Sequence, residues 1–264
     1  MHKAKQEAVK QWTNDPCGML AAKGLSVGTS EFYKQIDYNR YQEYAPWMKQ
    51  AIEFEKFSGK SVLEIGFGMG TDLFSFASAG AKVYGVDLSP QHLEIARSRF
   101  ALYNLPANLQ LADTESLPFE DNTFDVVYSF GVIHHTPDTE KAVSEIHRVL
   151  KPGGQAILAV YHKTSVFHLC VIAGYLLHRR FLKESYQDTL SRIEYRENSD
   201  ARPLVKLYSR KEFQYLLKQF SQTQIECFHL DKTHFSFLQN LVPDSLIKKW
   251  ENKYGWYLLA KSWK

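Results

Sequence analysis

Three glycines at alternating positions form the segment of this sequence that most clearly indicates chemistry. Gly66, Gly68 and Gly70 lie between a short apolar run at 61–65 and a segment with helical spacing. Glycines let a backbone turn tightly and approach a ligand with no Cβ in the way. The helix N-terminus that follows favours a carboxylate or a phosphate. A dinucleotide-binding loop has its third glycine one position later, where this chain has Thr71, so the loop favours a nucleotide-like ligand other than NAD.

Two aspartates follow the next two predicted strands. Asp87 comes 21 residues after Gly66, where an acidic side chain accepts hydrogen bonds from both ribose hydroxyls. Its alternative role is to cap the next helix, but Ser89 before Pro90 already supplies that cap. Asp113 follows the third predicted strand and is a candidate partner for an adenine amino group, or else a turn former. The loop and Asp87 together favour S-adenosylmethionine over NAD as the ligand.

Two histidines and a tyrosine are the candidates for acid–base chemistry. His134 and His135 follow the fourth predicted strand, and Tyr161 ends the fifth. A histidine at this edge can act as general base or orient an acceptor, because its pKa lies near neutrality. The alternative is that the histidines cap or pack the next short helix. No third ligand stands nearby in the sequence, so we expect no metal site.

The elements that position these residues alternate between strand and helix patterns. Such alternation is typical of a doubly wound α/β fold with helices on both faces of a parallel sheet. The pattern predicts a mostly parallel, seven-stranded sheet with strands at 61–65, 82–86, 109–112, 125–129, 155–160, 223–230 and 255–261. Ser209 and Glu212 fit a capping box before a late helix.

The flanks of this alternating region lack the parallel-strand pattern. We predict a helical lid at 1–50, a cofactor-binding core at 51–162, a lid insertion at 163–205 and completion of the core at 206–264. In the first lid, the aromatic side chains of Tyr33, Tyr38 and Tyr41 either close over the cofactor or pack on the core. Arg40 is a candidate partner for a cofactor carboxylate.

Several segments together resemble the class I S-adenosylmethionine-dependent methyltransferases. The similarity runs over roughly residues 59–162, and within the class the chain is most similar to a small-molecule group that includes quinone-biosynthesis enzymes. The matching segments are Val62-Leu-Glu-Ile-Gly-Phe-Gly-Met-Gly70, Val86-Asp-Leu-Ser89, Ala112-Asp-Thr-Glu-Ser-Leu-Pro-Phe119, Phe124-Asp-Val-Val127 and Arg148-Val-Leu-Lys-Pro-Gly-Gly154. Trp12 with Pro16-Cys17-Gly18 resembles an N-terminal signature of some bacterial members, to which we assign no role.

The resemblance implies a role for each matching position. The methionine part of the cofactor would be surrounded by Glu64, Gly66, Gly68 and Gly70. Asp87 would hold the ribose, with Leu88 beside the adenine and with Asp113 and Thr114 at the adenine edge. Phe130 would border the cofactor near its methyl group. Phe67 departs from the family, which often has a small residue there, and this affects the packing of the loop.

The expected function is in-line methyl transfer to a small-molecule acceptor. Two alternatives remain open, namely a catalytically silent S-adenosylmethionine-binding protein and a methyltransferase for a lipid-like or nucleic-acid acceptor. Lys and Arg outnumber Asp and Glu in residues 151–264, but no RNA-binding module is recognisable, so we expect no nucleic-acid partner. The sequence leaves the oligomeric state open.

Composition and apolar runs indicate a cytoplasmic protein. The three cysteines are far apart and the N-terminus lacks the apolar core of a signal peptide. The longest apolar run, 166–177, is too short to span a bilayer. With the basic residues after it, the segment 166–183 is either a lid helix or a site of peripheral membrane contact.

Overall fold

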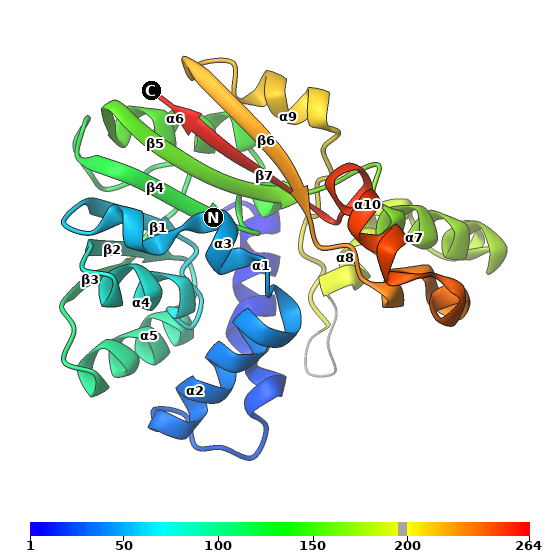
Figure 1. The fold of residues 1–264 in the computed structure, drawn as a ribbon, viewed down its shortest axis with the longest axis horizontal. Helices are drawn as coiled ribbons and strands as arrows, with labels where there is room; N and C mark the ends of the chain where they lie inside the picture. Colours follow the sequence, from blue (N-terminus) through cyan, green and yellow to red (C-terminus); the bar gives the residue numbers. More distant parts are fainter. Residues whose placement is uncertain (195–199) are drawn as a thin grey trace.

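A seven-stranded sheet forms the centre of the computed structural model, which describes residues 1–194 and 200–264. The strand order is β3-β2-β1-β4-β5-β7-β6, and β7 runs antiparallel to both of its neighbours (Figure 1). The strands are β1 (Ser61–Ile65), β2 (Lys82–Asp87), β3 (Ala107–Leu111), β4 (Phe124–Phe130), β5 (Leu150–Tyr161), β6 (Gln222–Phe228) and β7 (Tyr257–Trp263). The predicted α/β fold with a mostly parallel, seven-stranded sheet is confirmed.

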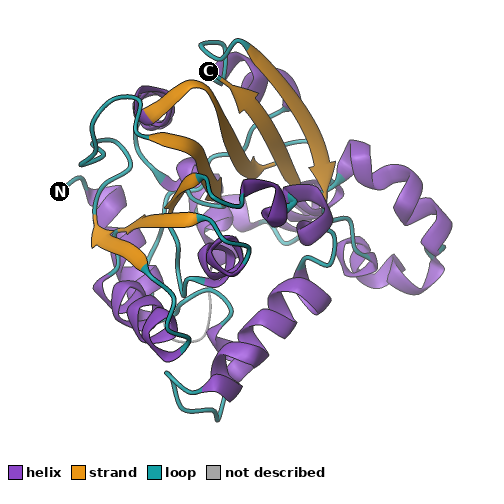
Figure 2. Cartoon of the chain, turned by 60° about the vertical axis from the view of Figure 1, so that its left-hand side comes forward, coloured by secondary structure: helices purple, strands orange, loops and turns teal. Residues whose placement is uncertain are grey.

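Helices lie on both faces of this sheet and at its two ends (Figure 2). They are α1 (Lys3–Asn14), α2 (Ser30–Tyr38), α3 (Met48–Ile52), α4 (Thr71–Ser78), α5 (Pro90–Leu102), α6 (Thr139–Val149), α7 (Val166–Leu177), α8 (Tyr186–Ser191), α9 (Arg210–Leu216) and α10 (Asp244–Tyr254). Their starting residues follow local chemistry. Ser89, the residue before the proline that opens α5, caps this helix by accepting a hydrogen bond from the His92 N–H. Ser209 and Glu212 form the predicted capping box of α9.

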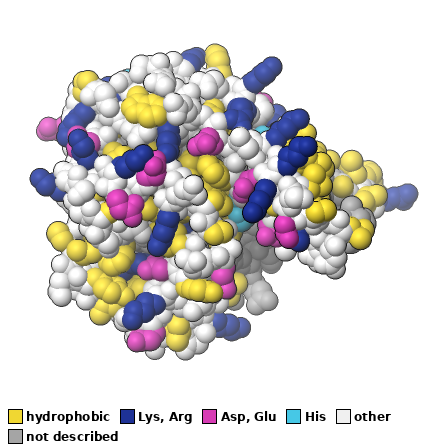
Figure 3. Space-filling view, viewed as in Figure 1, with side chains coloured by type: hydrophobic (Ala, Val, Ile, Leu, Met, Phe, Trp, Pro, Cys, Tyr) yellow, Lys and Arg dark blue, Asp and Glu magenta, His cyan; other side chains and the backbone are white. Residues whose placement is uncertain are grey.

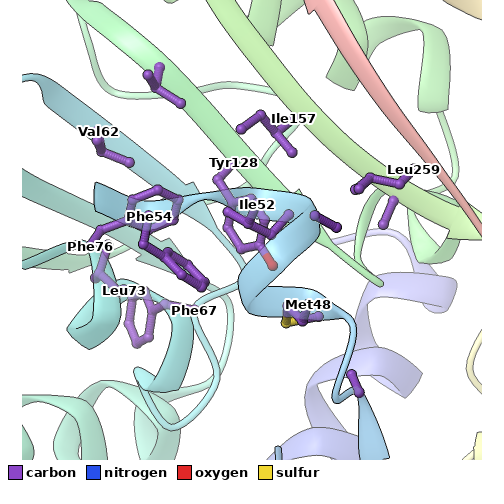
Figure 4. Packing of buried hydrophobic residues seen from close by; sticks show 14 of the residues in the cluster. Met48, Ile52, Phe54, Val62, Phe67, Leu73, Phe76, Tyr128, Ile157 and Leu259 are labelled. Carbon is purple, nitrogen blue, oxygen red and sulfur yellow. The ribbon is translucent and has the colours of Figure 1, made fainter. Parts of the chain in front are cut away.

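The buried strand residues alternate between two apolar clusters, one on each face of the sheet. On one face, Val62 and Tyr128 pack with residues of α3 and α4 (Figure 4). On the other face, Leu63 and Val127 pack with residues of α6 and α9. This alternation follows from the two-residue period of a strand. It explains why the strands read as continuous apolar runs, since both faces are covered.

Phe67, the departure from the family pattern, is accommodated inside the first of these clusters. Its side chain is 3% exposed and lies near Leu73 in Figure 4. A Cβ on Gly85 of β2 would come within 2.7 Å of the Phe67 ring, so the missing side chain at Gly85 makes room for that ring. The large residue in the glycine loop therefore packs on the sheet.

The start of β5 differs from the prediction. Helix α6 ends at Val149, next to the proline and glycine segment as expected, but the chain continues directly into β5 at Leu150 and not at residue 155. Leu150 pairs with Phe124 of β4, and the Gly153 N–H donates to the Lys264 carbonyl. The segment that ends the helix thus joins the sheet, because pairing with the chain end satisfies its backbone groups.

The strand order reverses between β1 and β4, which are adjacent and parallel. In open α/β sheets, ligands bind beside such a reversal at the carboxyl ends of the strands. One lobe at this edge contains α1 and α2, and another contains α7, α8 and α10 (Figure 1). Part of the predicted insertion at 163–205, residues 195–199, lies outside the described residues.

Candidate active site

A single cavity brings most of the predicted cofactor residues together at the carboxyl ends of β1 to β4. Seven of the ten predicted cofactor positions line it: Gly66, Gly68, Asp87, Leu88, Asp113, Thr114 and Phe130. Glu64, Gly70 and Arg40 lie outside its lining, as do the catalytic candidates His134 and Tyr161. His135 is the catalytic candidate that reaches the cavity wall.

The three glycines of the loop have different steric surroundings. All have positive φ angles, of 73°, 54° and 75° for Gly66, Gly68 and Gly70. A Cβ on Gly66 would lie 2.3 Å from Val132, and one on Gly70 would lie 3.1 Å from the Ala96 Cβ. A Cβ on Gly68 would meet no atom within 4 Å and would stand in open space at the cavity. Gly68 is therefore the position where the backbone itself faces a ligand.

Asp87 ties the glycine loop to the end of β2. Its carboxylate accepts the Gly68 N–H at 2.9 Å and the Ser89 N–H at 2.8 Å, and the His92 Nδ1 lies 3.1 Å away. Burial raises the pKa of Asp87, but His92 and the two N–H donors lower it more, so the pKa of Asp87 lies below its usual value of 3.8. The buried carboxylate is thus ionised and able to accept further hydrogen bonds at the cavity wall.

Three buried polar atoms near the cavity have no hydrogen-bond partner among the residues that the structure describes. His92 Nε2 and Thr114 Oγ1 belong to residues of the cavity wall, and Glu64 Oε2 belongs to the strand before the glycine loop. Burial and the nearby Asp72 charge raise the pKa of Glu64 well above 4.5. Unpaired buried polar atoms cost free energy unless something binds them. Their presence fits a ligand that offers amino, hydroxyl and ring-nitrogen groups, as S-adenosylmethionine does.

Arg40 makes a buried ion pair beside the cavity. It follows α2, in the single π-helical turn Asn39–Tyr44. Its guanidinium donates to Asp72 of α4, with Nη2 at 2.5 Å from Oδ2 and Nε at 3.2 Å from Oδ1. The guanidinium carbon also lies 4.5 Å from the ring centroid of Phe130. Arg40 therefore borders a cavity residue while its charge is paired with Asp72, and its role toward the cofactor carboxylate stays a prediction.

Helix α1 covers the cavity. Lys5 and Trp12 line it, together with Cys17 after the helix. The Trp12 and His135 ring centroids are 4.6 Å apart. Lys5 Nζ lies 2.5 Å from both Asp113 Oδ2 and Glu115 Oε2. Lys5 was not singled out in the sequence, although its spacing with Trp12 places both on one helix face.

The predicted lid tyrosines lie elsewhere. The Tyr33 hydroxyl donates to the Ile95 carbonyl of α5, the Tyr41 hydroxyl donates to Asp72, and Tyr38 is exposed. None of the three lines the cavity. The rings of Tyr33 and Tyr41 are thus buried, as in the second sequence interpretation, whereas Tyr38 neither closes over the cavity nor packs on the core. Helix α1 supplies the cover.

A buried polar cluster lies behind His135. The Tyr161 hydroxyl donates to Glu194 Oε1 at 2.6 Å, and His135 Nε2 lies 4.0 Å from the same oxygen. His135 Nδ1 donates to the Leu204 carbonyl at 2.6 Å, which leaves Nε2 as the free lone pair of the neutral ring. Burial lowers the pKa of His135, so the ring is neutral at pH 7. Glu194 had no local signal in the sequence, because only the fold brings it to Tyr161.

His134 is a packed residue in this structure. Its ring lies 4.0 Å from the Tyr161 ring, centroid to centroid, and neither ring nitrogen has a partner among the described residues. Burial and the neighbouring His135 lower the pKa of His134 well below 6.5. Across residues 1–194 and 200–264, no group of three or more His, Cys, Asp or Glu side chains is placed to hold a metal ion.

Comparison with known proteins agrees with the motif order and the fold. Residues 63–158 match the family described as methyltransferase domain. This stretch, the core of the sheet with its glycine loop, is thus similar to a methyltransferase domain. S-adenosylmethionine is therefore its cofactor, and the residues of the cavity fit that molecule.

Individual relatives of the chain are named for different molecules. A sterol 4-C-methyltransferase of Caenorhabditis elegans is 31% identical over 174 residues, which are 65% of this chain and 47% of the relative. A ubiquinone biosynthesis O-methyltransferase of Coxiella burnetii is 29% identical over 116 residues, which are 44% of this chain and 50% of the relative. The chain thus spans about half the length of these relatives.

Solved structures agree with the fold of the chain. An S-adenosylmethionine-dependent methyltransferase from Mesorhizobium loti superposes with a TM-score of 0.56 at 16% identity, covering 84% of this chain and 99% of that one. At this identity the likeness concerns the fold alone.

Proposed function

We propose that this protein transfers the methyl group of S-adenosylmethionine to a small-molecule acceptor. The observation that carries the proposal is the cavity at the reversal of strand order, where seven predicted cofactor positions meet two unpaired buried polar atoms. The two relatives described above are named for sterol methylation and ubiquinone biosynthesis, both of which concern small molecules. Their range of acceptors supports a small-molecule class without selecting one member.

In this proposal the residues of the chain position the cofactor and the acceptor, and the reactive group belongs to the cofactor. The cofactor supplies a methyl group already activated on a sulfonium. Glu64 and the glycine loop hold its methionine part, Asp87 holds the ribose, and Asp113 and Thr114 meet the adenine edge. Alignment of this kind can contribute roughly 7–11 kcal/mol to lowering a barrier. Helix α1, which covers the cavity, keeps water away from the reacting groups.

Proton removal is assigned to the cluster around His135. Its Nε2 is the basic nitrogen, because Nδ1 is committed to the Leu204 carbonyl. Glu194 lies 4.0 Å from that nitrogen and would stabilise the imidazolium formed when His135 takes a proton from the acceptor. Tyr161 orients Glu194 through its hydroxyl hydrogen bond. We give His134 no part in this transfer, because neither of its ring nitrogens has a hydrogen-bond partner among the described residues.

The first experiment is calorimetric titration of S-adenosylmethionine and of NADH into the wild type and Asp87→Ala. We expect binding of S-adenosylmethionine alone, weakened at least about tenfold in the variant, because unpaired ribose hydroxyls cost ~1.5 kcal/mol. Asp125→Ala is the matched control. Its carboxylate accepts from Ser61 and Lys151 at the opposite edge of the sheet, so binding should be unchanged.

An acceptor screen then separates the enzyme from its alternatives. Release of S-adenosylhomocysteine with small aromatic or lipid-like acceptors supports the proposal. Cofactor binding without release for any acceptor would favour a catalytically silent binding protein. Binding of NADH alone would overturn the assignment of the glycine loop.

A further inference from the structure

An apolar helix on the outside of the molecule leaves part of its apolar surface exposed to solvent. Ten of the twelve residues of α7 are apolar, and the helix contains no Asp, Glu, Lys or Arg. All of α7 is described, and its one buried side chain is His168. Helices with this composition normally bury their apolar surface against a core or a partner. The apolar surface of α7 is therefore one that something else covers.

The exposure is strongest at the far end of the helix. We call residues 176–183, the last turn of α7 and the turn after it, the α7 tip. The exposed fractions in it are 56% for Leu176, 81% for Leu177, 51% for Phe181 and 70% for Leu182. The tip is at the end of α7 away from the sheet (Figure 1), and Figure 3 shows apolar side chains gathered over the same lobe.

Basic side chains are interleaved with these apolar ones. Arg179, Arg180 and Lys183 are all exposed. The nearest acidic group, Glu184, is held by Arg192 at 2.8 Å, and Arg180 lies 4.0 Å from it. Apolar side chains beside Arg and Lys suit the boundary of an anionic bilayer, where the former enter the acyl region and the latter meet phosphate groups.

The length of α7 excludes a spanning role for it. A helix of this length extends about 18 Å, whereas the hydrocarbon core of a bilayer is about 30 Å thick. In the described ranges 1–194 and 200–264, no helix is both long and apolar enough to cross a membrane. Contact through the α7 tip would therefore be peripheral.

Packing holds the helix in this orientation and connects it to the site. The His168 side chain bonds to the Lys163 carbonyl and to the Tyr186 hydroxyl. The Phe167 ring contacts the Trp256 ring at 4.7 Å, and Trp256 stacks on Tyr161 at 4.3 Å. A bilayer at the tip would lie on the side of the molecule that leads, through these rings, to the Tyr161 cluster.

We propose that the α7 tip docks this protein onto bilayers that contain anionic phospholipids. Docking there would place the lobe that holds α7, α8 and α10 at the membrane, where a lipid-like acceptor is found. This second step rests on the proposed methyl transfer, whereas the docking itself does not.

The test is sedimentation of the full chain with two kinds of vesicle, one of phosphatidylcholine and one of equal parts phosphatidylcholine and phosphatidylglycerol. We expect binding to the second kind that weakens as salt is added. Leu176→Asp with Leu177→Asp should weaken it at least about tenfold, because two inserted leucines are lost. Arg179→Gln with Arg180→Gln should weaken it about 25-fold, since each cation near an anionic surface contributes about fivefold.

The matched control is Leu102→Asp with Leu111→Asp. These two leucines, on α5 and β3, are also exposed, by 43% and 47%, but lie outside the α7 tip. This variant should bind vesicles as the wild type does. Wild type that binds S-adenosylmethionine but no vesicles would overturn docking and leave the proposed function intact. Vesicle binding without S-adenosylmethionine binding would support docking and overturn the proposed function.

Two further outcomes also overturn the proposal. One is equal vesicle binding by the wild type and the Leu176→Asp, Leu177→Asp variant. The other is a dimer, measured by light scattering, that the same variant dissociates, because the tip would then join two copies of the chain. Circular dichroism and S-adenosylmethionine titration of each variant show that loss of vesicle binding is not loss of folding.

Discussion

Lys5 Nζ lies 2.5 Å from Asp113 Oδ2, so the covering helix α1 is bound directly to the position predicted to meet the adenine edge. The Lys5 side chain is 9% exposed. Burial lowers the pKa of Lys5, but Asp113 and Glu115 raise it more. The pKa of Lys5 therefore lies above its usual value of 10.5, and the ammonium is charged. The contact joins residues 108 positions apart in the sequence, and it ties the helix that covers the cavity to a predicted cofactor residue.

This relationship predicts that Lys5→Met loosens the cover. We expect S-adenosylmethionine to dissociate about fivefold faster, which corresponds to the ~1 kcal/mol that such an ion pair contributes. Stopped-flow fluorescence of the cofactor complex measures the rate. Lys10→Met removes an exposed ion pair with Asp200 from the same helix and should leave the rate unchanged. Equal rates for wild type and Lys5→Met would mean that α1 does not control release.

Gly68 in the glycine loop can be tested against Gly153, a glycine outside the loop with a similar backbone conformation. Both have positive φ, 54° and 75°, and a Cβ on either would meet no atom within 4 Å. Alanine at either position should lower the free energy of unfolding by about 1 kcal/mol, the cost of a left-handed residue with a Cβ. Because Gly68 lines the cavity, Gly68→Ala should also weaken S-adenosylmethionine binding at least about tenfold. Urea denaturation and calorimetry measure the two effects, and similar affinities in both variants would contradict the assignment of the loop.

Glu194→Gln tests the cluster behind His135. The amide keeps the shape that meets the Tyr161 hydroxyl but removes the charge beside His135. We expect S-adenosylmethionine affinity within about twofold of wild type and turnover with a screened acceptor reduced about 100-fold. Glu184→Gln, which changes a carboxylate of the same insertion, should retain full turnover. Unchanged turnover and pH profile in Glu194→Gln would remove Glu194 from the proposed proton transfer.

His229 predicts how stability depends on pH. Burial and the neighbouring His234 lower the pKa of His229 from 6.5 to about 4. Below pH 6.5 the unfolded chain binds a proton that the folded protein does not bind until about pH 4, so the free energy of unfolding falls as pH drops through this range. His229 has a φ of 70°, which asparagine tolerates, so His229→Asn removes the proton site without backbone strain.

Urea denaturation at pH 7.5 and pH 5 checks this prediction. The wild type should lose more stability over the interval than His229→Asn. Above pH 7.5 the two proteins should change in parallel, because the histidine is neutral in both the folded and unfolded states there. The same loss in both proteins between pH 7.5 and pH 5 would show that His229 does not contribute.

Local patterns were sufficient to predict the sheet and the loop that it carries. β1 occurs at Ser61–Ile65 as predicted, because a buried parallel strand is a continuous apolar run that ends where glycines begin. Ser89 before Pro90 predicted the start of α5, because a cap depends on a few adjacent residues. The start of β5 was predicted five residues late, because pairing of Leu150 with Phe124 depends on a distant strand.

By itself, then, the sequence determined the resemblance of residues 63–158 to a methyltransferase domain, the order of strands along the chain and seven of the residues that line the cavity. These depend on spacings within single strand–loop–helix units, where neighbours in sequence are neighbours in space. Tertiary structure alone decided that Lys5 and Trp12 cover the cavity, that Arg40 pairs with Asp72, and that Glu194 joins Tyr161. The physical reason is that each of these contacts is made between elements whose relative placement is set by burial of the whole core, which no local spacing records.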